Sequence, residues 1–205
     1  MSTVLIERED HYRMAIRFPL LGEMTDDEFL EFCQANRDLR IERTAEGEII
    51  VMPPTGGETG NRNSELNFQL VGWSKRDGTG KVFDSSTGFK LPNGAERSPD
   101  AAWVSHSRLA QLTAEEKRKF IPLCPDFVIE LRSPTDRMID LKEKMEEYIA
   151  NGARLGWLID AQEKRVYVYM PGREVEFIDG ALTISGEPVL LGFSLDLRSI
   201  WAPRL

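Results

Sequence analysis

Apolar residues at helical spacing mark two long segments of the chain. Leu66, Leu70 and Trp73 follow one another at i, i+4 and i+7, which predicts a helix over residues 61–75. A second helix is predicted over residues 136–151, where a glycine follows the last apolar positions. Its buried face is expected to consist of four apolar residues: Met138, Leu141, Met145 and Ile149. Each helix therefore has one apolar face that needs a covering surface.

Shorter apolar runs, bounded by glycine, proline and charged residues, predict the strands. A hairpin is expected over residues 40–52, turning at Gly47. Further strands are expected at residues 81–83, 88–91, 100–104, 125–132, 156–160 and 165–169. Thr25 with Glu28 three positions later predicts the capped start of a helix, and a short helical segment is predicted over residues 113–120. This order of elements indicates an α/β fold with a mixed sheet and helices packed against it.

The composition is that of a globular protein with an acidic balance. The chain has 205 residues, of which 41% are hydrophobic and 29% charged, and its formal net charge is −8. This length is sufficient for a genuine core, and no repeat or long linker divides the chain, which favours one compact unit. The negative charge disfavours a protein that coats nucleic acid through clustered lysine and arginine. It does not exclude a nuclease, because metal-binding carboxylates add negative charge.

Three features of the sequence bear on its location. No apolar run approaches the ~20 residues needed to span a bilayer, so no membrane partner is expected. The N-terminal residues have neither the basic start nor the apolar stretch of a signal peptide. Cys33 and Cys124 lie far apart and lack the spacing of a metal site. Together these features predict a cytoplasmic protein with reduced cysteines.

Two carboxylates lie within apolar runs, where an unpaired charge is costly. Asp100 precedes Ala-Ala-Trp-Val, and Glu130 interrupts the run Phe-Val-Ile-Glu-Leu. On neighbouring strands the two acids would be able to share a hard divalent cation such as Mg²⁺, which accepts one or two carboxylates and keeps several waters. Alternation along the strand places Arg132 on the same face as Glu130. The alternative is therefore a pair of structural acids in ion pairs, with Glu130 bound to Arg132 or Arg137.

The order of these motifs resembles a known group of nucleases. A Pro-Asp pair, followed by an apolar strand that ends in Glu-X-basic, resembles the PD-(D/E)XK nuclease superfamily. More narrowly, residues 47–160 resemble the Uma-two family of restriction-endonuclease-like proteins. The matching segments are Glu48-Ile-Ile-Val-Met-Pro-Pro-Thr-Gly-Gly, Ser98-Pro-Asp-Ala-Ala, Pro125-Asp-Phe-Val-Ile-Glu-Leu-Arg-Ser-Pro-Thr, Asp140-Leu-Lys-Glu-Lys-Met-Glu-Glu-Tyr and Ala150-Asn-Gly-Ala-Arg-Leu-Gly-Trp-Leu-Ile-Asp. The resemblance implies a restriction-endonuclease-like core over residues 47–205, with an N-terminal helix and hairpin extension over residues 1–46.

The resemblance also implies roles for individual residues. Asp100 and Glu130 match the metal carboxylates of the family, and Glu65 in the first long helix would supply a further acid near the metal. The usual lysine of the superfamily motif is replaced by Arg132, which is always protonated and would hold a phosphate oxygen. A lysine from the following helix substitutes for it, and Lys144 matches that position. Its charge would orient the attacking water or neutralise the charge that develops on phosphate.

Periodicity alone does not choose between Lys144 and Lys142. The two lysines flank the apolar face of the predicted helix on opposite sides, and only the resemblance favours Lys144. Two further residues are weaker candidates for the surroundings of the metal. Gln69 lies one turn after Glu65, and Asp126 shares a strand face with Glu130.

These features predict an endonuclease that hydrolyses phosphodiester bonds of DNA with Mg²⁺, or with Mn²⁺ in its place. The expected catalytic residues are Asp100, Glu130, Lys144 and Arg132, and the expected metal ligands are Asp100, Glu130 and Glu65. The superfamily resemblance implies a homodimer, in which two sites address two strands. The competing hypothesis is a nuclease-like fold without efficient cleavage that serves as a nucleic-acid or protein interaction module. The acidic balance and the lack of an obvious DNA-reading element favour this alternative.

Overall fold

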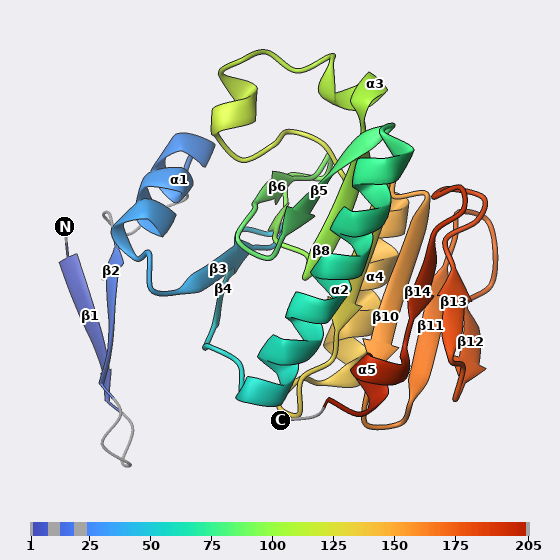
Figure 1. The fold of residues 1–205 in the computed structure, drawn as a ribbon. Coiled ribbons are helices and arrows are strands. Elements are labelled where there is room, and N and C mark those ends of the chain that lie inside the picture. The colour runs from blue at the N-terminus through green and yellow to red at the C-terminus, as the bar shows by residue number, and fades with distance from the viewer. Residues whose placement is uncertain (1, 8–12, 19–23, 204–205) are drawn as a thin grey trace.

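A computed structural model of the protein describes residues 2–7, 13–18 and 24–203 (Figure 1). Its central element is a six-stranded sheet with the strand order β12-β11-β10-β9-β8-β5. The strands are β5 (Gly80–Asp84), β8 (Ala101–Ser105), β9 (Phe127–Leu131), β10 (Leu155–Asp160), β11 (Arg165–Tyr169) and β12 (Glu176–Asp179). The pair β9 and β10 is parallel, and the other neighbouring pairs are antiparallel. The sheet is therefore mixed, as predicted.

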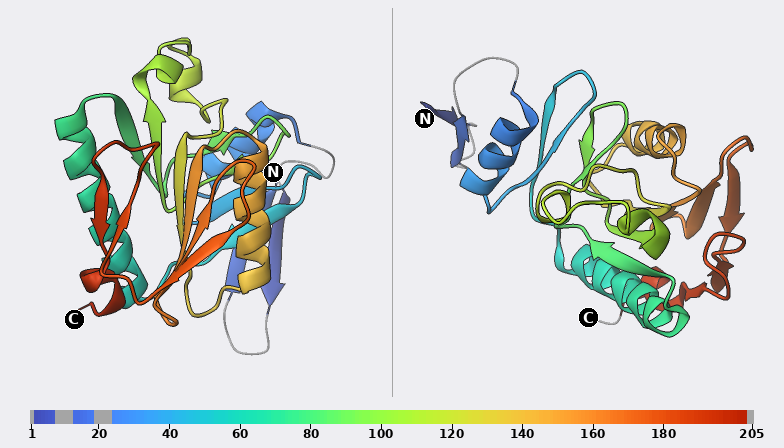
Figure 2. Two further views of the ribbon diagram at one scale, coloured as in Figure 1. Left: turned by 90° about the vertical axis from the view of Figure 1, so that its right-hand side faces the viewer. Right: turned by 90° about the horizontal axis from the view of Figure 1, so that it is seen from above.

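Two helices cover opposite faces of this sheet (Figures 1 and 2). One apolar core joins Leu66 and Leu70 of α2 (Gly57–Asp77) to the first face. A second core joins Met145 and Tyr148 of α4 (Met138–Ala150) to the other face. The two cores take alternate residues of β8, because successive side chains of a strand point to opposite sides. Both predicted helices and their apolar faces are confirmed.

A second sheet joins the N-terminal part of the chain to the segment that precedes β8. Its order is β4-β3-β7-β6. The strands are β3 (Arg40–Arg43), β4 (Ile49–Met52), β6 (Phe89–Lys90) and β7 (Glu96–Arg97). The hairpin of β3 and β4 confirms the predicted one, and Gly47 adopts a positive φ of 88° near its turn. Since β3 also pairs with β7 through Arg43 and Glu96, the polar residues of β3 lie close to the start of β8.

The helix α1 (Asp26–Ala35) packs beside this second sheet. Its N-terminus has the predicted capping box, in which the Thr25 hydroxyl accepts from the backbone of Glu28 and the Glu28 carboxylate accepts from the backbone of Thr25. Phe29 and Phe32 are buried against Ile41 of β3. The antiparallel strands β1 (Ser2–Glu7) and β2 (Arg13–Phe18) precede α1.

The C-terminal elements pack on the α2 side of the molecule. They are β13 (Thr183–Ser185), β14 (Ser194–Asp196) and α5 (Arg198–Trp201). The predicted helix over residues 113–120 is wrong. The short helix α3 (His106–Leu109) ends before this segment begins. Within residues 113–120 the structure has only a 3-10 turn at Glu116–Arg118. Most of its side chains are exposed, so a helix here would have no apolar face to bury and little to stabilise it.

Candidate active site

Asp100 and Glu130 lie next to each other at one end of β8 and β9. Ala101 pairs with Ile129 in the antiparallel register, and one further step along both strands sets Asp100 opposite Glu130. The backbone N–H of Leu131 donates to Oδ2 of Asp100 at 2.8 Å, which fixes the carboxylate against β9. The two residues are only 7% and 3% exposed. The structure therefore brings together the two acids that the sequence singled out.

Lys144 and Tyr148 of α4 reach the same place. The Lys144 Nζ lies 2.8 Å from Oε1 of Glu130, and the Tyr148 hydroxyl donates to the same oxygen at 3.0 Å. The two side chains come from positions i and i+4, which share one side of a helix. Lys142 is directed elsewhere, because its Nζ lies over the ring of Tyr167, 4.8 Å from the centroid. Of the two lysines that periodicity left open, the structure places Lys144 at the acids.

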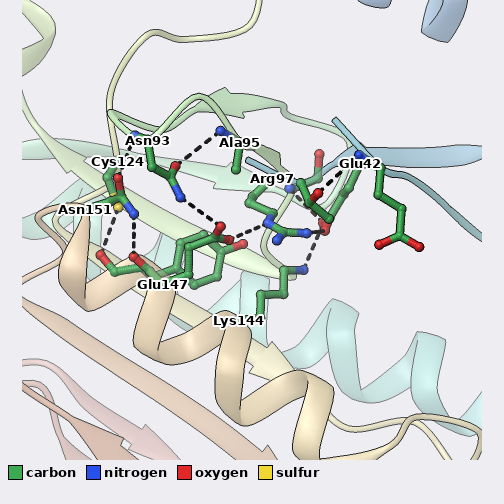
Figure 3. Close-up of polar contacts among 12 residues, drawn as sticks. Glu42, Asn93, Ala95, Arg97, Cys124, Lys144, Glu147 and Asn151 are labelled. Carbon is green, nitrogen blue, oxygen red and sulfur yellow. Dashed lines mark hydrogen bonds and ion pairs between the residues drawn. The ribbon is translucent and has the colours of Figure 1, made fainter. Parts of the chain in front are cut away.

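Glu42 of β3 completes this arrangement, although it was not among the site residues predicted from the sequence. Its Oε1 accepts from Lys144 at 2.8 Å and from the backbone N–H of Ser98 at 2.9 Å. Its Oε2 lies 3.3 Å from Arg97, whose Nε donates to Glu147 of α4 at 2.6 Å. Figure 3 shows this chain of contacts, which runs from β3 through β7 to α4. Lys144 is thus held between two carboxylates from different parts of the chain.

Arg40 and two asparagines surround Asp100 on its other side. Arg40 Nη1 donates to Oδ1 of Asp100 at 2.8 Å, and its Nη2 donates to the carbonyl of Ser98. Asn63 of α2 approaches the same Oδ1 at 3.4 Å, and Asn67 donates to the carbonyl of Asp100 at 3.1 Å. The asparagines lie one turn apart, so one side of α2 faces this acid. Alternation in the strand 40–43 signalled a polar face with Arg40 and Glu42, but it did not indicate their partners.

Burial and neighbouring charges set the protonation states. Burial raises the pKa of Glu130 to about 7, against the opposing effect of Lys144. For Lys144, burial acts to lower the pKa, but the charges of Glu130 and Glu42 outweigh it and the pKa rises. For Glu42, burial acts to raise the pKa, but Lys144 and Arg40 outweigh it and the pKa falls. Lys144 is therefore a fixed positive charge at neutral pH and is not available as a base.

Arg132 does not reach the two acids. Its Nη1 donates to Oδ2 of Asp160 at 2.7 Å, at the end of β10. The strand β9 ends at Leu131, so the strict alternation that was expected to place Arg132 beside Glu130 no longer applies there. The alternative in which Glu130 pairs with Arg132 or Arg137 is also wrong, because Lys144 is the ion-pair partner of Glu130. The structure thus does not support Arg132 as a phosphate clamp.

Glu65 is likewise absent from the immediate surroundings of the acids. Its Oε1 accepts from Gln69 at 2.9 Å, and Gln69 in turn binds the backbone of Asp196 in β14. This side of α2 faces the C-terminal hairpin, whereas Asn63 and Asn67 face Asp100. The helix therefore presents asparagines, and not the expected glutamate, to the candidate site.

Asp126 has a structural role at the far end of β9. Its Oδ2 accepts from the backbone N–H of Ser105 at 2.9 Å, and its Oδ1 lies 3.3 Å from Arg108. The residue is almost completely buried. Asp126 directly precedes β9, and the first residues of that strand separate it from Glu130 and the site.

A cleft of about 1170 Å³ opens over the acids. It is bounded by α1, the glycine-rich loop before α2 and residues 133–136, and both Asp100 and Glu130 line it. Their carboxylates are the hard oxygen donors that Mg²⁺ and Mn²⁺ prefer, so the residues fit such an ion. Among the described residues, no group of three or more His, Cys, Asp or Glu side chains is placed to hold a metal. Water or substrate oxygens would therefore have to complete the coordination of an ion here.

The central mixed sheet flanked by helices is a restriction-endonuclease-like fold. Residues 26–198 match the Uma2 family, which is described as putative restriction endonuclease. The match spans most of the chain, and the chain belongs to this family. No helix in the described ranges is long and apolar enough to cross a membrane.

The solved structures that resemble this one include one described as a putative nuclease. The crystal structure of a putative nuclease belonging to DUF820 from Anabaena variabilis superposes with a TM-score of 0.67 at 22% identity, over 78% of this chain and 89% of that one. At this identity the likeness shows the fold alone. A DrdV–DNA complex reaches a TM-score of only 0.36 at 15% identity, over 60% of this chain and 12% of that one, and supports no conclusion. The comparison with curated proteins gave no match.

Proposed function

We propose that the protein is a divalent-metal-dependent endonuclease that hydrolyses phosphodiester bonds of DNA. The observation that carries the proposal is the meeting of Asp100, Glu130 and the Lys144 ammonium group beside a large cleft. Asp100 directly precedes β8, Glu130 lies in the adjacent strand β9, and Lys144 lies in the helix α4 that follows. Membership of a family described as putative restriction endonuclease supports a nuclease.

Asp100 and Glu130 are the residues that would hold Mg²⁺ or Mn²⁺. When bound, such an ion polarises the phosphodiester and lowers the pKa of a water molecule. Lys144 keeps its proton and supplies a fixed positive charge beside Glu130 for the charge that develops on the phosphate. Glu42 and Tyr148 orient the site, since one binds the Lys144 ammonium group and the other donates to Glu130.

The proposal includes two features that rest on the superfamily resemblance. The substrate is DNA, and the active form is a homodimer in which two sites address the two strands. Light scattering of the purified protein, with and without a DNA duplex, measures the mass of both species. A monomer in both conditions contradicts the homodimer but leaves the chemistry of the single site unaffected.

The test is nicking of supercoiled plasmid DNA by the purified protein with Mg²⁺ or Mn²⁺. Asp100→Asn, Glu130→Gln and Lys144→Met are each expected to lower the rate about 100-fold or more, because each removes a charge at the reacting centre. Lys142→Met is the matched control on the same helix and is expected to retain the wild-type rate, since Lys142 lies over Tyr167. Equal background nicking by all the proteins would overturn the proposal and favour a nuclease-like interaction module.

A further inference from the structure

Arg40 reaches from β3 onto one of the candidate metal ligands. Its Nη1 donates to Oδ1 of Asp100 at 2.8 Å, and its Nη2 donates to the carbonyl of Ser98. The Arg40 side chain is 27% exposed and lines the cleft. The Arg40 side chain is thus accessible from the cleft, and its guanidinium group binds a carboxylate of the site.

Donors of the protein occupy both carboxylate oxygens of Asp100. Oδ2 accepts from the backbone of Leu131, and Oδ1 accepts from Arg40. The backbone contact belongs to the junction of β8 and β9, whereas the contact with Arg40 is made by a side chain from the second sheet. A divalent ion that binds Oδ1 therefore competes with the guanidinium group for the same oxygen.

The charges around the site are consistent with such an exchange. Within the described residues, the connected group contains four carboxylates and three cations: Glu42, Asp100, Glu130, Glu147, Arg40, Arg97 and Lys144. With every group charged, its net charge is −1. When Arg40 leaves, the net charge becomes −2, which a divalent ion neutralises.

Two polar atoms in the wall of the cleft lack a partner among the described residues. They are the Arg40 Nε–H, a donor, and the Asn63 Oδ1, an acceptor, and both are buried. Both residues line the cleft next to Asp100. These two atoms therefore have hydrogen-bonding capacity that the described residues leave unused.

We propose that Arg40 is a phosphate-binding residue that the metal releases: it neutralises Asp100 in the metal-free protein and binds a substrate phosphate once a divalent ion takes Asp100. This inference rests on the proposed function, because it needs a metal at Asp100 and a phosphodiester in the cleft. Arginine suits both states, since its planar fork of donors matches carboxylate and phosphate alike. Arg40 thereby takes the role that the sequence suggested for Arg132, which is paired with Asp160.

The first test measures metal binding without any turnover. Metal-free wild type, Arg40→Gln and Arg165→Gln are titrated with Mn²⁺ in a calorimeter. Arg40→Gln is expected to bind Mn²⁺ about tenfold more tightly, because the competing cation is gone. Arg165→Gln is the matched control, since Arg165 also pairs with an aspartate, Asp179, and its side chain is similarly exposed at 34%. Its Mn²⁺ affinity is expected to equal that of the wild type.

The second test measures DNA binding in Ca²⁺ over a series of salt concentrations, with a fluorescent duplex as the probe. Loss of one phosphate contact lowers the slope of log affinity against log salt by about 0.9. Arg40→Gln is expected to bind the duplex more weakly and with this smaller slope. Arg40→Lys is expected to keep the slope, because it keeps the charge. It is also expected to bind Mn²⁺ about threefold more tightly than wild type, because lysine has no fork to hold Asp100.

The combination of results separates the proposal from a structural role. Tighter Mn²⁺ binding together with weaker DNA binding by Arg40→Gln supports the proposal. Loss of a merely structural contact would instead weaken the binding of both Mn²⁺ and DNA. Unchanged or weaker Mn²⁺ binding by folded Arg40→Gln overturns it, even if the wild type nicks plasmid and the proposed function stands. Absence of both Mn²⁺ binding and nicking in the wild type overturns the two proposals together. If thermal melting shows that Arg40→Gln is unfolded, Arg40→Lys decides the question by the same criteria.

Discussion

Glu42 of β3 and Lys144 of α4 form a buried ion pair of 2.8 Å although 102 residues separate them in the chain. Both side chains are almost fully removed from solvent, at 2% and 11% exposed. The same ammonium group also contacts Glu130. The position of the candidate active-site lysine is therefore fixed by the second sheet as well as by the central one.

The Glu42–Lys144 pair is expected to be strongly coupled in stability. Glu42→Gln and Lys144→Met each leave a buried charge with fewer partners and are expected to cost about 3 kcal/mol of unfolding free energy. The double variant is expected to lose clearly less than the sum, with a coupling of about 1–3 kcal/mol. Urea unfolding of the four proteins measures this cycle. Additive losses would contradict a direct interaction between the two side chains.

The stability of the metal-free protein is expected to depend on pH through Glu130. Burial raises the pKa of its carboxyl to about 7, from the ordinary glutamate value of 4.5. Between these values the folded protein holds a proton that the unfolded chain has lost. Glu130 therefore contributes stability below pH 4.5, and this contribution is lost as the pH rises through about 7.

Glu130→Gln removes this dependence, because glutamine does not titrate. The unfolding free energy of the variant relative to wild type is expected to rise steadily from pH 4.5 to pH 7.5. Urea titrations at several pH values, with a chelator present, measure the difference. A difference that stays constant over this range would show that the carboxyl of Glu130 titrates normally.

Tyr148→Phe is expected to weaken the site without disrupting the fold. The hydroxyl of the fully buried Tyr148 donates to Oε1 of Glu130 at 3.0 Å, and its loss is expected to cost about 1 kcal/mol in unfolding free energy. In a Glu130→Gln background the cost is expected to be smaller, because the charged acceptor is gone. Urea unfolding of the single and double variants provides the comparison. An equal cost in both backgrounds would mean that Tyr148 acts through packing alone.

Both cysteines are expected to resist thiol reagents in the folded protein. Burial raises the pKa of Cys33 and of Cys124 to about 12, so almost no thiolate is present at pH 8. An aromatic disulfide reagent such as DTNB is expected to react slowly with the native protein and rapidly with both thiols in urea. Cys33→Ser identifies which thiol reacts. Fast labelling of Cys124 in the native state would contradict its burial beneath α4.

The local elements were largely readable from the sequence, because each follows from short-range spacing. The apolar stripe of Leu66, Leu70 and Trp73 predicted α2, and the glycine at position 47 predicted the turn between β3 and β4. The prediction was wrong at residues 113–120, where the mutual hydrogen bonds of Thr113 and Glu116 cap only one 3-10 turn. A cap stabilises the end of a helix but does not supply an apolar face for it to bury.

By itself, the sequence determined the strand that contains Glu130 and the strand that Asp100 precedes, because both are apolar runs. It also determined that each carboxylate requires a partner. Only the tertiary structure decided what those partners are. It brought Lys144 and not Lys142 to Glu130, placed Arg40 and not Arg132 at the acids, and turned Glu65 away. The physical reason is that spacing fixes which face of an element a residue occupies. The contact that such a face makes depends on packing between segments far apart in the chain.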